Sequence, residues 1–295
     1  MPISSTFPFE SKFVDVHGSK MHYVEEGHGN VVLFLHGNPA SCYIWRNIIP
    51  HVSKGSRAIA VDLIGMGKSD KPDIGYHYDD HSRYVEGFVE ALGLKDITLV
   101  IQDWGSLIGF RYAHEHEANV RGIAFMEASV RPLNFKDMPL DTRIMLPVVR
   151  TFPFGYLLIQ VGNIFLSKLL HEMTLRKLAK EEIAAYNAPF PTIKSRKPVA
   201  QFPLEVPFDG KPVKNHSTVA GYSEWLKVTQ MPKLFLKFSP GVLINKDMAA
   251  WIEKSLPNIT TVDCGAGKHF VQEDDPDLIG QEIVAWMSAT QSKKK

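Results

Sequence analysis

Short, continuous runs of apolar residues recur along the chain, separated by longer stretches in which apolar positions have a helical spacing. Four of these runs are typical of strands buried on both faces of a sheet. They are residues 31–35, 58–61, 97–101 and 120–126. The stretches with helical spacing are residues 43–52, 80–92 and 104–115. Strands that alternate with helices in this order predict a parallel, doubly wound α/β sheet.

The same rhythm is present at both ends of the chain. Residues 13–16 and 21–25 alternate between apolar and polar positions around His17, Gly18 and Ser19, which predicts a hairpin of two strands. Late in the chain we expect two more strands and two helices. The strands are residues 233–238 and 260–263, and the helices are residues 248–255 and 278–287. The prediction is therefore a mostly parallel, eight-stranded sheet flanked by helices.

One long stretch interrupts this pattern. Between residues 130 and 213 there is no buried-strand run, only helical segments and ten prolines. An insertion of this size into an alternating sheet predicts a helical cap over the sheet. We therefore expect residues 1–130 and 213–295 to form the core, and residues 131–212 to form the cap.

Composition and charge narrow the possible classes of protein. The chain of 295 residues is 44% hydrophobic and 22% charged, which is typical of globular proteins. Its 33 basic and 32 acidic residues give a net charge of +1. This balance provides no field for a polyanion, so nucleic acid is not an expected partner. The only basic run is Lys293, Lys294 and Lys295, which we expect to be a solvated tail.

Other features predict a cytoplasmic protein. The two cysteines, Cys42 and Cys264, cannot form a disulfide framework, and no metal cluster is expected. Residues 1–11 lack the basic and apolar regions of a signal peptide. Residues 144–170 are strongly apolar, but charged and polar side chains, prolines and a glycine interrupt them. We expect helices that close over a cavity there, and no membrane span.

An aspartate stands where a buried strand is expected to pass into a helix. The sequence Ile101-Gln102-Asp103-Trp104-Gly105 resembles a nucleophile elbow, with aspartate in place of serine and Ile101 where a small residue is usual. An aspartate in front of a helix is also a common N-cap. The pentapeptide alone leaves a nucleophile and a cap as alternatives.

The loop after residues 31–35 contains His36, Gly37, Asn38 and Pro39. In α/β-hydrolases this loop donates one backbone N–H to the oxyanion hole, and the residue after the nucleophile, here Trp104, donates the other. Gly, Asn and Pro also form ordinary turns. The loop therefore favours a catalytic interpretation only in combination with the elbow.

His269 is the candidate base, because it alone of twelve histidines lies after the last expected strand. The chain order nucleophile, acid, histidine is that of α/β-hydrolases. We expect most other histidines to lie on the surface, in polar surroundings. They are His17, His22, His28, His77, His81, His114, His116 and His216.

Two strand ends could supply the acid that orients His269. No carboxylate follows residues 233–238, where the chain continues as Ser239-Pro240-Gly241, whereas Glu127 stands directly at the end of residues 120–126. We therefore predict that Glu127 is the third member of the triad. The alternative is a salt bridge from Glu127 to Arg121 or Arg131.

A second glycine-containing loop is not expected to bind phosphate. Residues 65–69 end in Gly67, Lys68 and Ser69, as a phosphate-binding loop does, but Asp62 occupies the position of the first required glycine. We expect a tight turn after a strand.

As an ordered set, these motifs resemble those of the haloalkane dehalogenases, in particular the subfamily whose acid is a glutamate after the sixth strand. The resemblance runs from about residue 13 to residue 287. The motifs are His36-Gly37-Asn38-Pro39, Trp45-Arg46-Asn47-Ile48, Asp62-Leu63-Ile64-Gly65-Met66-Gly67, Gln102-Asp103-Trp104-Gly105-Ser106, Phe125-Met126-Glu127-Ala128 and His269-Phe270-Val271-Gln272-Glu273-Asp274. Luciferases of the Renilla type, which oxidise coelenterazine, share most of them.

The resemblance implies an α/β-hydrolase fold with a cap, and hydrolysis of an alkyl halide through an alkyl ester of Asp103. It implies that Asn38 and Trp104 bind the halide through N–H donors. Matching pocket positions are Phe165, Phe202, Pro203, Leu243 and Phe270. Met138 and residues 151–154 depart most from the family, which leaves the tunnel shape undetermined. The expected partners are a small halogenated alkane, water and halide, with no cofactor or metal, in a monomer or homodimer that detoxifies halogenated alkanes.

Three alternatives remain open at this stage. A coelenterazine luciferase would need a pocket for a large imidazopyrazinone. An epoxide hydrolase would need acid donors in the cap, for which Tyr156, Tyr186 and Tyr222 are candidates. A non-catalytic receptor on the same fold would not need an intact triad.

Overall fold

The computed structural model describes residues 3–138 and 140–292. Residues 1–2, Pro139 and the basic tail Lys293–Lys295 lie outside the described residues. Eight strands form one sheet in the order β1-β2-β4-β3-β5-β6-β7-β8. The strands are β1 Lys12–Val16, β2 Ser19–Glu26, β3 Val31–Leu35, β4 Arg57–Val61, β5 Ile97–Asp103, β6 Val120–Ala128, β7 Lys233–Pro240 and β8 Ile259–Gly267.

Strand direction divides the sheet into a short antiparallel edge and a long parallel part. β1 pairs antiparallel with β2, and β2 pairs antiparallel with β4. All other neighbours are parallel, with Leu35 of β3 opposite Val61 on one side and opposite Ile101 on the other. The chain reverses its direction across the sheet between β3 and β5, and ligands of open α/β sheets bind beyond the strand ends at such a point.

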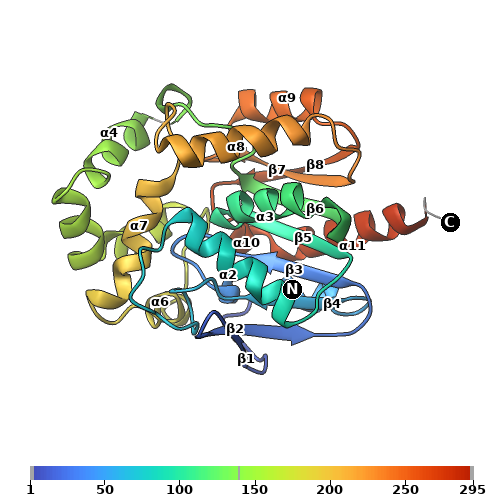
Figure 1. Ribbon diagram of the computed structural model, residues 1–295, viewed down its shortest axis with the longest axis horizontal. Helices are drawn as coiled ribbons and strands as arrows, with labels where there is room; N and C mark the ends of the chain where they lie inside the picture. The colour runs from blue at the N-terminus through green and yellow to red at the C-terminus, as the bar shows by residue number, and fades with distance from the viewer. Residues whose placement is uncertain (1–2, 139, 293–295) are drawn as a thin grey trace.

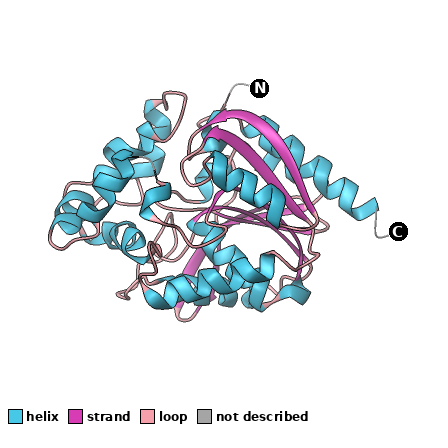
Figure 2. Cartoon of the chain, turned by 90° about the horizontal axis from the view of Figure 1, so that it is seen from above, coloured by secondary structure: helices cyan, strands magenta, loops and turns pink. Residues whose placement is uncertain are grey.

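Helices cover both faces of this sheet (Figures 1 and 2). α2, α3 and α8 pack together on one face, while α1 and α11 pack together on the other. The α-helices are α1 Ile49–Val52, α2 Tyr78–Ala91, α3 Trp104–Glu115, α4 Leu140–Val149, α5 Leu170–Glu172, α6 Lys180–Asn187, α7 Lys197–Glu205, α8 Val213–Leu226, α9 Lys246–Ser255, α10 Val271–Asp274 and α11 Pro276–Ser292. The observed architecture is thus the predicted α/β fold with eight strands.

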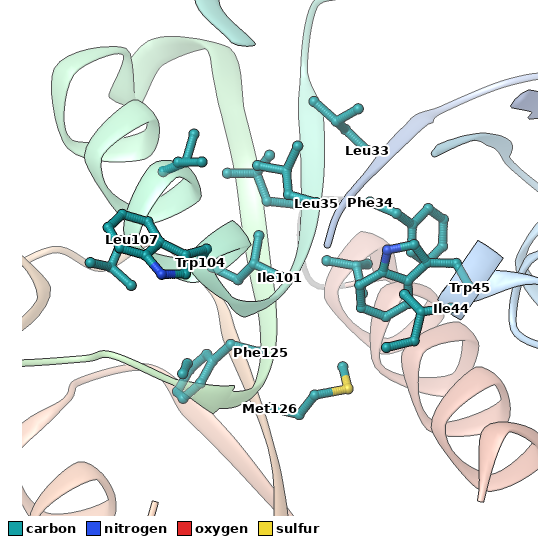
Figure 3. Packing of buried hydrophobic residues seen from close by; sticks show 14 of the residues in the cluster. Leu33, Phe34, Leu35, Ile44, Trp45, Ile101, Trp104, Leu107, Phe125 and Met126 are labelled. Atoms are coloured by element: carbon teal, nitrogen blue, oxygen red, sulfur yellow. The ribbon is translucent and has the colours of Figure 1, made fainter. Parts of the chain in front are cut away.

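The core follows from the alternation of side chains along the central strands. The ring of Phe34 on β3 packs against Trp45, with ring centroids 5.3 Å apart. The neighbouring Leu35 points to the other face, where it and Ile101 lie toward α3 (Figure 3). All four of these apolar side chains are fully buried. Burial on both faces is the reason that these strands have continuous apolar sequences.

Between β6 and α8 the chain forms helices and no strand longer than an isolated bridge within the described residues. Besides α4 to α7 there are two π-helical turns, η4 Tyr156–Val161 and η5 Phe165–Leu169, and two 3₁₀ turns, η3 Phe135–Asp137 and η6 Lys194–Arg196. We call residues 135–205 the helical segment. It lies at one end of the molecule, away from α11 and the C-terminus (Figure 1).

Several elements differ from the expectation. The helix expected at residues 43–52 is broken into a 3₁₀ turn, η1 Cys42–Trp45, and the short α1, which contains Pro50. β8 continues four residues beyond the expected strand. α8 was not expected, because its polar sequence with Gly221 hides the buried positions Val219 and Leu226. A further short 3₁₀ turn, η2 Glu117–Asn119, precedes β6. No helix of the described residues is long and apolar enough to cross a membrane.

Candidate active site

Asp103 is the last residue of β5 and directly precedes α3. Its backbone has φ 49° and ψ −125°, a conformation that residues other than glycine rarely adopt. Its carboxylate makes no capping hydrogen bond to the helix. Asp103 thus stands at the N-cap position of α3 without capping the helix through its side chain, and the turn has the sharp strand-to-helix geometry of a nucleophile elbow.

Glycines permit the close approaches that this turn requires. A Cβ atom at Gly105 would lie 2.0 Å from the carbonyl oxygen of Leu35, and one at Gly37 would lie 2.1 Å from Asp103 Oδ2. Ile101 is accommodated because α3 carries Gly109 opposite it, where a Cβ would lie 2.7 Å from Ile101 Cγ2. The absence of a side chain at Gly109 of α3 thus provides the space that Ile101 needs in place of a small residue.

The two oxygens of the Asp103 carboxylate have different partners. Oδ2 accepts a hydrogen bond of 2.7 Å from the backbone N–H of Asn38. Oδ1 lies 3.4 Å from Nε2 of His269. The elbow is further fixed by Ser106, whose hydroxyl donates to the Asp103 carbonyl oxygen and accepts from the backbone N–H of Ser129.

Glu127, at the end of β6, faces the other ring nitrogen of His269, with Oε2 3.2 Å from Nδ1. The carboxylate is buried and also accepts backbone N–H groups from three successive residues, Val242, Leu243 and Ile244. These belong to the turn after β7, the strand end that carries no carboxylate of its own. Arg121, one of the two arginines considered as partners of Glu127, pairs with Asp96 instead.

His269 lies between two carboxylates, and this position sets its protonation. Burial alone would lower the pKa of His269, but the hydrogen bonds and attraction from Asp103 and Glu127 outweigh burial and raise the pKa to about 9. The ring is therefore protonated at neutral pH while Asp103 is charged. Its backbone is held by Gln102, whose side-chain N–H donates to the His269 carbonyl oxygen at 3.1 Å.

Asn38 and Trp104 both lie at the wall of a cavity next to Asp103. Asn38 Nδ2 donates to the carbonyl oxygen of Val199 at 3.2 Å, and an amide has a second N–H. The indole of Trp104 packs edge-on against Tyr78, with ring centroids 5.7 Å apart, and lies tilted against Phe202, with centroids 4.7 Å apart. These contacts hold the side chains of Asn38 and Trp104, the expected halide donors, in the wall of the cavity that Asp103 also lines.

The cavity has a volume of about 160 Å³ and lies between the strand ends and the helical segment. Phe165, Pro203, Leu243 and Phe270 line it, as expected for pocket residues, and Met138 does too. Phe202 is not among the lining residues. Its ring is stacked on His81, with ring centroids 4.4 Å apart, and packs against the indole of Trp104.

Known proteins share this architecture over nearly the whole chain. Residues 30–203 match the sequence model of the alpha/beta hydrolase fold family. A haloalkane dehalogenase of Mesorhizobium japonicum is 42% identical over 96% of this chain and 92% of its own length. One from Sphingobium indicum is 40% identical over 95% of this chain and 96% of its own. The crystal structure of haloalkane dehalogenase DbeA from Bradyrhizobium elkani has a TM-score of 0.94, with 38% identity and coverage of 97% and 99%. This chain belongs to the haloalkane dehalogenase family.

Near the site, this family member contains a buried ionic network that the sequence did not reveal. Glu273 of α10 accepts hydrogen bonds from Arg46 at 2.6 and 2.8 Å, from Arg176, and from the hydroxyl of Tyr186. Glu182 of α6 bridges the same two arginines. The network begins four residues after His269 and ties α10 to η1 and α6. The sequence placed Arg46 and Glu273 in separate motifs, but it could not predict that they form an ion pair, because they lie far apart along the chain.

Two histidines expected on the surface are buried, His22 and His81. His22 Nδ1 bonds to Asp62 Oδ2 at 2.7 Å, and Cys42 lies beside them, so these three could hold a metal ion by distance alone. However, Asp62 also accepts the backbone N–H groups of Cys42 and Lys68, and burial raises the pKa of the Cys42 thiol. The hydrogen bonds to Asp62 therefore stabilise this part of the core.

The loop of residues 65–69 wraps the same aspartate. A Cβ at Gly67 would lie 2.0 Å from Asp62 Oδ2, and the Lys68 N–H points to that oxygen. The carboxylate of Asp62 occupies the space in which a phosphate-binding loop would hold a phosphate. The tight turn expected from the sequence is what the structure contains.

Proposed function

We propose that this haloalkane dehalogenase hydrolyses the carbon–halogen bond of small alkyl halides through an alkyl ester of Asp103. The observation that carries the proposal is the carboxylate of Asp103, which stands at the end of β5 on a backbone with positive φ and faces an apolar cavity whose described lining residues include no second carboxylate. A carboxylate is ionised at neutral pH and can attack carbon without a base.

In the first step, Asp103 Oδ1 forms a bond to the carbon and the carbon–halogen bond breaks, so that the halide leaves with the electron pair. The side-chain N–H of Asn38 and the indole N–H of Trp104 stabilise the developing negative charge. Oδ2 keeps its hydrogen bond to the backbone of Asn38 and becomes the carbonyl oxygen of the ester.

In the second step, His269 removes a proton from water, which attacks the ester carbonyl carbon. Alkylation neutralises Asp103, so one of the two interactions that raise the pKa of His269 disappears when the ester forms. The ring becomes a base at the moment when a base is needed. The backbone N–H groups of Asn38 and Trp104 stabilise the oxyanion, and breakdown releases the alcohol and regenerates the carboxylate. When the ester forms, the ring first gives its own proton to solvent. The proton that it then takes from water stays on His269 and restores the protonated ring of the free protein.

Glu127 is the proposed acid that orients His269, which groups this chain with the family members whose acid is a glutamate after the sixth strand. Three backbone N–H donors hold the carboxylate, and its Oε2 fixes the tautomer of His269 through Nδ1. The helical segment is the proposed cap, with residues 131–212 as its limits, and its inner side closes the cavity.

Two alternative activities have weaker support. The three candidate acid donors of an epoxide hydrolase are not at the cavity, since Tyr186 bonds to Glu273, Tyr222 bonds to the carbonyl oxygen of Ser129, and Tyr156 is exposed. A Renilla-type luciferase must enclose an imidazopyrazinone. The cavity beside Asp103 has a volume of about 160 Å³, which is below the roughly 300–1,000 Å³ of pockets for drug-sized ligands.

The test compares halide release from 1,2-dibromoethane with light emission on addition of coelenterazine. We expect halide release by the parent protein and none by a folded Asp103→Ala variant. Light emission without halide release would assign the chain to the luciferase class. Halide release that persists in Asp103→Ala would contradict the role of the carboxylate.

A further inference from the structure

Gln102 is the residue of β5 directly before Asp103, and its side chain reaches the proposed base. Gln102 is fully buried. Its Nε2 donates a hydrogen bond of 3.1 Å to the carbonyl oxygen of His269 and lies 3.3 Å from Nε2 of the His269 ring. One side-chain amide therefore contacts both the backbone and the proton-accepting nitrogen of this histidine.

The contact with the carbonyl oxygen determines which end of the Gln102 amide faces the ring. A carbonyl oxygen can only accept, so the group that meets the carbonyl of His269 is the NH₂ end of the amide. An NH₂ group has two hydrogens, and the second one is available to ring Nε2. Gln102 thus presents a donor to the nitrogen that removes the proton from water.

This donor distinguishes the two protonation states of His269. Nδ1 lies 3.2 Å from Oε2 of Glu127 and keeps its proton in both states. When Nε2 also carries a proton, it meets the N–H of Gln102 donor to donor, and no hydrogen bond forms. When Nε2 is free, its lone pair accepts from Gln102. The contact therefore stabilises the neutral ring with the lone pair on Nε2, which is the form that acts as a base.

The charged groups that face the ring act in the opposite direction. Asp103 from β5 and Glu127 from β6 favour the protonated ring of His269, whereas burial disfavours it. The neighbouring ring of Phe270, with centroids 4.9 Å apart, does not titrate. Alkylation neutralises Asp103, but Glu127 keeps its charge. At this stage burial and Gln102 oppose Glu127.

We propose that Gln102 is a positioning residue of the second step, which holds His269 as the neutral base after the ester has formed. Its consequence for catalysis rests on the proposed function, whereas the contact acts on the ring without substrate. The first step does not need Gln102, because the carboxylate of Asp103 attacks carbon without a base. Loss of the contact should therefore slow hydrolysis of the ester and leave its formation unchanged.

The kinetic experiment is a single turnover by Gln102→Met, whose side chain is similar in size but has no N–H. Quench-flow measures bromide release from 1,2-dibromoethane for the first step and formation of 2-bromoethanol for the second. Bromide release should be unchanged. On the acidic side of the pH profile the alcohol should form about threefold to tenfold more slowly, which is the effect of losing one hydrogen bond.

On the alkaline side the two rates of alcohol formation should converge, because the His269 ring is then neutral in both proteins. A residue that only held the backbone of His269 would lower the rate by the same factor at every pH. That result for Gln102→Met would overturn the proposal.

A titration without turnover tests Gln102 separately from the proposed function. Asp103→Ala removes the charge that alkylation would neutralise, and NMR measures the pH midpoint of the His269 ring. Addition of Gln102→Met should raise this midpoint by about 0.5 to 1 pH unit, which corresponds to the same threefold to tenfold effect. Gln272→Met in the same background is the matched control, and its midpoint should not change. Gln272 of α10 is also fully buried, and its amide has no hydrogen-bond partner within the described residues.

The same midpoint with and without Gln102→Met would overturn the proposal. No bromide release by the parent would contradict the proposed function, and the titration would still decide the role of Gln102. Circular dichroism verifies the fold of each variant. If Gln102→Met does not fold, Gln102→Leu also removes the N–H and should raise the midpoint in the same way.

Discussion

The two proposed catalytic carboxylates share a strained backbone. Asp103 has φ 49° and Glu127 has φ 40°, and each stands where a strand of the parallel sheet ends. Such conformations cost on the order of 1–3 kcal/mol and persist where the surroundings enforce them. Both carboxylates also lie close to glycine backbone, at Gly37 for Asp103 and at Gly241 for Glu127.

A methyl group at Gly37 should displace the nucleophile without unfolding the protein. In Gly37→Ala the new Cβ would meet Asp103 Oδ2 at 2.1 Å, so the carboxylate must move. A misplacement of this kind reduces kcat/KM by about 100-fold. Gly55→Ala is the control, because a Cβ there meets nothing within 4 Å. Equal halide release by the two variants would show that the contact does not position Asp103.

The pKa of His269 should depend on Asp103. In Asp103→Ala the histidine keeps the burial that lowers its pKa and loses one of the partners that raise it, so we expect a value below about 9. Titration of the ring signals by NMR measures both values. Because the folded pKa of the parent is raised, His269 stabilises the fold fully below its unfolded pKa of about 6.5, and this contribution is lost as the pH rises through about 9. An unchanged titration in the variant would contradict the ion pair.

At the scale of elements, the sequence best predicted the strands and helices whose burial determines the pattern of apolar residues. The central strands were found because they are buried on both faces, and α3 was found from its helical spacing and the elbow in front of it. The arrangement of α4, η4 and η5 was not predictable, since their apolar residues serve a cavity and a surface as well as a core. The proposed catalytic residues followed from motif order. Helices over a cavity were expected at residues 144–170, but the sequence did not identify Met145 and the other residues of α4 that line it.

The network that joins α10 to η1 and α6 should stabilise the loop that carries His269. Glu273→Gln removes a fully buried charge and leaves Arg46 and Arg176 without it. Loss of one partner of a buried pair costs about 3–5 kcal/mol, and the remaining Glu182 should reduce this to roughly 2–4 kcal/mol. Urea denaturation measures the free energy of unfolding.

Glu224→Gln is the control for that measurement. It breaks an exposed pair with Lys227 and should change the free energy of unfolding by less than about 1 kcal/mol. A similar small effect for Glu273→Gln would mean that the network contributes little to stability.

At the scale of the whole molecule, the site is divided between two parts of the chain. The sheet supplies the carboxylates, the histidine and the N–H donors, and the helical segment supplies much of the apolar wall. A fixed set of reacting groups at the strand ends can therefore serve different substrates as the inserted helices vary. The size of the cavity follows from the packing of α4 and η5, which no local sequence pattern specifies.

Opposite sides of α4 should affect substrate range differently. Met145→Trp would fill part of the cavity and should lower kcat/KM more for long bromoalkanes than for 1,2-dibromoethane. Ile144→Trp, one position away on the exposed side, should leave both values unchanged. Steady-state halide release over a series of chain lengths measures the effect. The same substrate profile for both variants would contradict the assignment of α4 as a cavity wall.

The most direct test of the proposed chemistry is a single turnover by His269→Phe. Asp103 needs no activation, so this variant should react with 1,2-dibromoethane, release about one equivalent of bromide per site and stop. Phe fills the space of the imidazole and excludes a water that could split the ester. Intact-protein mass spectrometry should then find the added alkyl group, and proteolysis should locate it on Asp103. A folded His269→Phe protein that binds substrate but releases no bromide and gains no mass would contradict the two-step mechanism.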